Sequence, residues 1–163
     1  MIISDLDLDG DLDLVTRNQS LFGHNDGNSI NLYYQDLSSL NSEKKWKRTS
    51  IKINHGEGLA VNKINNDAYP DIIVDQMWLK NPGQSKTDPW LHYRYTDSWT
   101  WQHVSISVAD INNDRRNDII LTPSEQEGQH YRISWFLAPE NPTKLWTENV
   151  IDSHVEAMHH AIQ

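Results

Sequence analysis

The chain is an acidic polypeptide of 163 residues, with 14 lysines and arginines, 23 aspartates and glutamates, and a formal net charge of −9. Its length allows one domain with a substantial buried core. No apolar run reaches the roughly 18 residues of a membrane-spanning helix, so membrane insertion is not expected. The absence of cysteine excludes disulfides, thiolate metal sites and cysteine nucleophiles. The negative charge disfavours nucleic acid and other polyanions as partners.

The first predicted element is an acidic loop within SDLDLDGDLDLV (4–15). Aspartates occupy its relative positions one, three, five and nine, and we call residues 5–13 loop one. Strand-like runs follow directly after the loop, at INLYY (30–34), and from Trp46 onward. The opening third of the chain therefore predicts an acidic loop flanked by short strands.

The same order recurs twice. The run GLAVN (58–62) leads into loop two (63–71), followed by MWL (77–79), an Asn-Pro-Gly turn and a strand from Trp90. The run SISVA (105–109) leads into loop three (110–118), followed by ISWFL (133–137), a proline-rich turn and a strand from Trp146. The chain stops at HHAIQ, where a fourth acidic loop would be due. The loops begin 58 and 47 residues apart, so the pattern is an internal repeat.

Each repeat predicts four short strands joined by turns, with no segment of helical period. Four antiparallel strands in about 50 residues are typical of a β-propeller blade. We therefore predict one all-β segment over residues 1–163, made of about three four-stranded blades at 1–54, 55–103 and 104–163. Closed propellers usually contain about four to eight blades. We expect either a partial propeller belonging to a longer chain or a homodimer that completes the ring.

The turns WLKNPG (78–83) and WFLAPENP (135–142) take corresponding places in the second and third repeats. The spacing from Trp90 to His103 is 13 residues, as is the spacing from Trp146 to His159. With these features and its acidic loops, the chain resembles the FG-GAP or VCBS repeats of integrin-alpha-like propellers. The resemblance covers essentially the whole chain. It implies calcium in the loops, a metal-bearing face, and an extracellular or periplasmic setting. Met1 leads straight into an acidic stretch, so no signal peptide is expected and the location stays open.

The loops carry the strongest chemical signal in the sequence. Oxygen ligands at alternate positions of a tight loop suit calcium, which takes six to eight oxygens. The alternative is a solvated acidic turn, but five carboxylates in nine residues would repel one another without a cation. Predicted ligands are Asp5, Asp7, Asp9, Asp13 and the Asp11 carbonyl in loop one, and Asp110, Asn112, Asp114 and Asp118 in loop three.

The other loops depart from the first. In loop three Arg115 stands where Gly10 makes the turn, so weaker binding is expected there. In loop two Lys63 occupies the first ligand position. We expect its ammonium group to replace the metal by donating to Asp67 and Asp71. The ions are expected to be structural, so chelation should lower thermal stability.

The links between the fourth strand of one repeat and the first strand of the next carry most of the histidines and two tryptophans. The expected role of these histidines is structural first, ligand binding second and catalysis third. The ligand-binding candidates are His55, Trp99, Trp101, His103, His159 and His160. In the binding interpretation the tryptophans are platforms for sugar rings. In the catalytic one, His103, His159 or His160 abstracts a proton beside a uronate carboxylate, which Arg94, Arg132 or Lys80 neutralises.

The resemblance and the loops together predict a calcium-stabilised module that binds a partner through the face opposite the metal loops, a carbohydrate in preference to a protein, without catalysis. A polysaccharide-degrading, lyase-like enzyme domain is the first alternative. An integrin-like protein adhesion module is the second. Such repeats occur in all three classes, so the fold alone does not choose among them.

Overall fold

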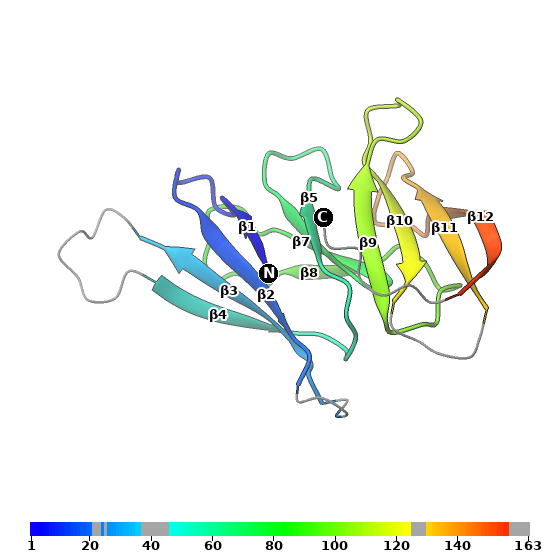
Figure 1. Cartoon of the computed structure of the whole chain (residues 1–163). Helices are drawn as coiled ribbons and strands as arrows, with labels where there is room; N and C mark the ends of the chain where they lie inside the picture. The colour runs from blue at the N-terminus through cyan, green and yellow to red at the C-terminus, as the bar shows by residue number, and fades with distance from the viewer. Residues whose placement is uncertain (21–23, 25, 37–45, 125–129, 157–163) are drawn as a thin grey trace.

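The computed structural model describes residues 1–20, 24, 26–36, 46–124 and 130–156. Over these ranges every regular element is a β-strand (Figure 1). No helix in the described ranges is long and apolar enough to cross a membrane.

Twelve strands in the described residues form three four-stranded sheets. The first sheet contains β1 (Ile2–Ser4), β2 (Asp13–Asn18), β3 (Ser29–Gln35) and β4 (Trp46–Lys52). The second contains β5 (Ala60–Asn62), β6 (Asp71–Val74), β7 (Met77–Lys80) and β8 (Leu91–Arg94). The third contains β9 (Val104–Ala109), β10 (Asp118–Pro123), β11 (Tyr131–Leu137) and β12 (Thr147–Val155).

Within each sheet the strands lie side by side in chain order, and every neighbouring pair is antiparallel. The prediction of an all-β chain with a recurring four-stranded antiparallel unit is therefore confirmed. The first strands also contact one another across the sheets, β1 with β5 and β5 with β9. In Figure 1 the three acidic loops lie toward the upper end of the sheets, and the links 53–59 and 95–103 lie toward the lower end.

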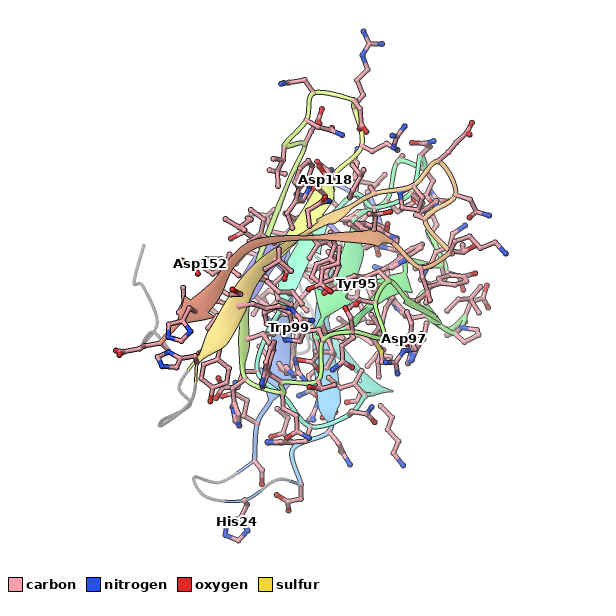
Figure 2. All side chains as sticks on the ribbon, turned by 90° about the vertical axis from the view of Figure 1, so that its right-hand side faces the viewer. His24, Tyr95, Asp97, Trp99, Asp118 and Asp152 are labelled. Carbon is pink, nitrogen blue, oxygen red and sulfur yellow. The ribbon has the colours of Figure 1, made fainter. Side chains whose placement is uncertain are left out.

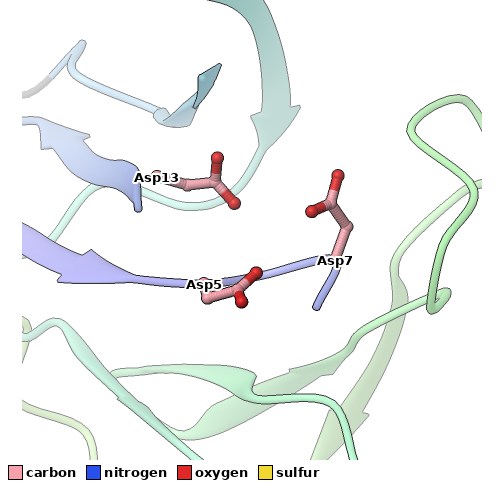
Figure 3. A group of neighbouring side chains, drawn as sticks. All are labelled: Asp5, Asp7 and Asp13. Atoms are coloured by element: carbon pink, nitrogen blue, oxygen red, sulfur yellow. The ribbon is translucent and has the colours of Figure 1, made fainter. Parts of the chain in front are cut away.

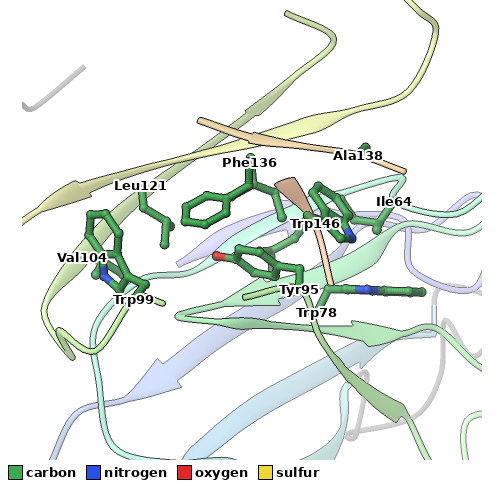
Figure 4. Packing of buried hydrophobic residues seen from close by; sticks show 11 residues of the cluster. Ile64, Trp78, Tyr95, Trp99, Val104, Leu121, Phe136, Ala138 and Trp146 are labelled. Carbon is green, nitrogen blue, oxygen red and sulfur yellow. The ribbon is translucent and has the colours of Figure 1, made fainter. Parts of the chain in front are cut away.

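The middle sheet is buried on both faces, which explains why all four residues of β6 are buried. Neighbouring side chains of a strand point to opposite faces. Accordingly, Ile72 and Val74 pack in the cluster shared with the first sheet, whereas Ile73 packs in the cluster shared with the third. Figure 4 shows the second cluster, where Trp78 and Phe136 lie between the two sheets. The core is thus two apolar layers separated by one sheet.

Candidate metal centre and the opposite end

The last aspartate of each acidic loop has the same structural role in all three repeats. Asp13 accepts backbone N–H groups from Leu6 and from Gln35, each at 2.9 Å. Asp71 and Asp118 accept the equivalent hydrogen bonds. In each case one backbone N–H comes from the start of the same loop and another from the residue after the third strand of the same sheet. All three carboxylates are fully buried. These residues fix each loop against its own sheet, a role that the spacing alone did not predict.

Loop one brings three of its predicted ligands together (Figure 3). One carboxylate oxygen from each of Asp5, Asp7 and Asp13 lies within 4.8 Å of the other two. We call these three residues the aspartate cluster. It is the only cluster of three or more potential metal ligands among histidines, aspartates and glutamates in the described part of the chain.

The aspartate cluster contains oxygens that the surrounding protein does not satisfy. Asp7 is 3% exposed, and no donor from the described residues reaches its Oδ1 atom or Oδ1 of Asp5. Burial raises the pKa of Asp13, and the charges of Asp7 and Asp9 add to that rise, although two backbone N–H groups oppose it. Crowded carboxylates with buried, unpaired oxygens fit a hard divalent cation such as calcium.

A lysine from the second sheet already contacts part of loop one. Lys86 lies in the turn between β7 and β8, and its Nζ atom is 2.5 Å from Asp7 Oδ2 and 3.2 Å from Asp9 Oδ2. The Asp9 carboxylate also accepts the Asp11 N–H, which lowers the pKa of Asp9. Lys86 was not among the sequence candidates, because no local signal links it to a loop almost 80 residues away.

Loop three shares two left-handed backbone positions with loop one but has a different charge arrangement. Asn113 and Arg115 have φ values of 61° and 70°, as Leu8 and Gly10 have 58° and 94° at the corresponding positions. The carboxylate of Asp114, however, pairs with the Arg116 guanidinium at 2.5 Å. The carboxylates of loop three are not gathered as those of loop one are, so calcium there stays a prediction.

In loop two the expected role of Lys63 is wrong. Lys63 is exposed and forms no ion pair with Asp67 or Asp71 in the described structure. Lys80 of β7 lies nearest instead, with its Nζ atom 3.8 Å from Asp67 Oδ2. Asp71 is held by backbone donors, and it has no need of a lysine. The first position of the loop therefore does not supply the substitute cation.

At the opposite end of the sheets, a buried ion pair joins the first and second sheets. Both terminal nitrogens of Arg17, on β2, donate to Asp75 in the β6–β7 turn, at 2.8 and 2.6 Å. The same guanidinium donates to the carbonyls of Gly58 and Asn54. The side chains are only 3% and 9% exposed. Burial raises the pKa of Asp75, against the lowering effect of Arg17.

Next to this pair, two of the predicted histidines approach each other. The rings of His55 and His103 meet edge to face with centroids 6.1 Å apart. His103 Nδ1 lies 3.1 Å from Glu57 Oε1, and Ser124 Oγ lies 3.4 Å from Glu57 Oε2. Glu57 also lines a cavity of about 280 Å³, together with residues 58–59, Gln19 and the start of β9. Glu57 is a polar group that the sequence analysis missed.

The two predicted tryptophan platforms belong to the core and its edge. Trp99, which is labelled near the middle of Figure 2, is 1% exposed and packs against Trp101 and Phe136. The Arg132 guanidinium lies 5.5 Å from the Trp99 ring centroid and 5.0 Å from that of Trp101. A buried indole presents no face to a sugar, so we do not retain Trp99 as a ligand platform. Trp101 is partly exposed, with Arg132 over its ring.

The basic residues of the catalytic interpretation have partners elsewhere. Arg94 pairs with the exposed Asp97 at 2.7 Å, and Arg132 pairs with Glu148 at 2.6 Å.

His154 stacks on His130 with centroids 3.5 Å apart. His159 and His160 lie outside the described residues, so their predicted roles stay predictions.

No protein-family model, curated protein or solved structure matches this chain.

Proposed function

We propose that this chain is a calcium-stabilised propeller module of the FG-GAP or VCBS type, which binds a carbohydrate at the end opposite its acidic loops. The observation that carries the calcium part is the aspartate cluster, in which Asp7 is 3% exposed and has an oxygen with no donor from the described residues. Asp5, Asp7 and Asp13 would hold the ion. Bound calcium would neutralise the crowded carboxylates and fix loop one.

Calcium titration by isothermal calorimetry tests this part, together with thermal unfolding in calcium and in chelator. Calcium should bind the wild type and raise its melting temperature, because a ligand that binds only the folded state stabilises it. Asp7→Asn should lose the calcium site of loop one and the stabilisation that this site gives. Asp152→Asn changes an exposed carboxylate on β12 and should leave both unchanged. A wild-type melting temperature that is the same in calcium and in chelator would contradict the proposal.

The propeller part rests on the sheets themselves. Three sheets with strands in chain order, whose first strands contact one another, support this proposal, because successive propeller blades would be arranged in this way. Ile3 of the first sheet and Ile151 of the third are 57% and 59% exposed. We propose that further blades cover the outer sheets, from a second copy or from the rest of a longer chain. Sedimentation equilibrium distinguishes the two, because the first requires a dimer of this chain.

The ligand part rests on the cavity of about 280 Å³ beside Glu57. Its size is at the lower limit of ligand pockets, which suits a single sugar unit of a longer glycan. The Glu57 carboxylate is 13% exposed and offers acceptors for sugar hydroxyl groups. Chemical-shift titration with a panel of neutral and acidic oligosaccharides tests this. Glu57→Gln should weaken binding, whereas Glu156→Gln, at an exposed position, should not.

One observation favours lyase-like catalysis as a second candidate function. Glu57 lies 3.1 Å from His103 Nδ1, and a carboxylate in that position favours the tautomer whose Nε2 atom can accept a proton. Incubation with uronate polysaccharides, while the absorbance of unsaturated product is followed, separates the two functions. Product that disappears in His103→Ala would establish catalysis. Binding of a glycan without formation of product would support the binding module over the enzyme.

A further inference from the structure

Each acidic loop has a basic side chain near its fifth-position aspartate. Lys86 reaches Asp9 of loop one at 3.2 Å, Arg116 reaches Asp114 of loop three at 2.5 Å, and Lys80 reaches Asp67 of loop two at 3.8 Å. In loops two and three the cation belongs to the same sheet or to the loop itself. Only loop one receives its cation from a neighbouring sheet.

Loop one also differs because its lysine leaves some carboxylate oxygens without a hydrogen-bond donor in the described structure. Lys86 contacts Asp7 Oδ2, but Asp7 Oδ1 and Asp5 Oδ1 are buried without a donor from the described residues. An ammonium group is one point charge with three donors, so it does not satisfy a three-carboxylate cluster. Resting on the calcium site proposed above, we propose that Lys86 is a tethered competitor of calcium: the two exchange at Asp7 and Asp9, and Lys86 sets the calcium affinity.

The geometry makes joint occupancy unfavourable. Calcium binds carboxylate oxygens at about 2.3–2.6 Å, and Lys86 Nζ is 2.5 Å from Asp7 Oδ2. Calcium on the same oxygen would lie within about 5 Å of the ammonium group. Two cations at this distance repel each other strongly beside a side chain that is 3% exposed. The Lys86 side chain is 28% exposed, so it has a path to solvent when calcium displaces it.

Calorimetric calcium titration of Lys86→Met at constant pH and ionic strength tests the proposal. Methionine keeps much of the apolar stem and removes the charge. The calcium Kd should fall about two- to fivefold, the range expected for loss of a partly exposed ion pair. Lys80→Met is the matched control, because it removes the cation of loop two, and its Kd should equal that of the wild type. Equal or weaker binding by Lys86→Met, with normal wild-type binding, would overturn the proposal.

A second measurement uses the wild type and does not depend on how a variant folds. Reductive methylation, followed by peptide mass spectrometry, reports how accessible each lysine amine is. Calcium should raise the labelling rate of Lys86 severalfold relative to the exposed Lys63. An unchanged ratio in a wild type that binds calcium would overturn the competition. Absence of calcium binding in both the wild type and Lys86→Met would instead overturn the proposed calcium site. Binding by Lys86→Met alone would support the competition in its strongest form.

Discussion

The buried ion pair between Arg17 and Asp75 provides a test of how the first two sheets are held together. Arg17→Met removes four hydrogen bonds from the guanidinium, two of them to Asp75. It also leaves the Asp75 carboxylate, 9% exposed, without its cation. Removing one partner of a buried pair typically costs about 3–5 kcal/mol. A domain has about 5–15 kcal/mol of stability, so this loss would be a large fraction of the total.

Urea unfolding at pH 7, followed by tryptophan fluorescence, measures this loss. Arg48→Met is the control, because Arg48 is exposed on β4 and should contribute less than about 1 kcal/mol. The double variant Arg17→Met with Asp75→Asn should lose less than the sum of the two single variants, because neither charge remains buried alone. A loss for Arg17→Met no larger than for Arg48→Met, or strict additivity in the double variant, would refute the reasoning.

Two further predictions concern nearby backbone and pH. Gly56→Ala should lower the stability to urea, because the added Cβ atom would lie 2.6 Å from Arg17 Nη2 and 2.7 Å from Asp75 Oδ1. The same stability as the wild type would show that the Arg17 and Asp75 side chains move aside at little cost. Burial raises the pKa of Asp71 to about 6, from an ordinary value of about 3.9. The folded chain therefore holds a proton that the unfolded chain has lost, and the Asp71 contribution to the unfolding free energy should fall as pH rises from about 4 to about 6. Asp71→Asn should make the slope shallower without removing it, because the pKa values of Asp13 and Asp75 are also raised. An equal slope in both proteins would show that another group causes it.

The strands and their grouping were predictable because local pattern determines them. The spacing from one acidic loop to the next, with turn residues between apolar runs, predicts four strands in each repeat. The ninth-position aspartates Asp13, Asp71 and Asp118 lie at the start of β2, β6 and β10, so the loop motif also located the second strand of each sheet. The dense run of aspartates in loop one predicted a cluster of carboxylates, and Asp5, Asp7 and Asp13 do lie close together.

The remainder of the site depends on contacts between repeats. Lys86 meets Asp7, and Arg17 meets Asp75, because neighbouring sheets pack at one particular angle and offset. No local pattern encodes that packing. The prediction of Trp99 as a sugar platform failed for the same reason. A tryptophan in a link between strands can lie on the surface or in the core, and its sequence position does not say which. The Lys63 prediction failed because Lys63 is exposed and Lys80 of β7 lies nearest to Asp67, a contact that the position of a lysine within the loop does not reveal.

Native mass spectrometry in a calcium-containing buffer tests the central claim most directly, since it counts bound ions on each chain. The aspartate cluster predicts that the wild type retains calcium and that Asp7→Asn loses one ion relative to it. The same calcium count in both proteins, or a wild-type chain free of calcium at saturating concentration, would contradict the account.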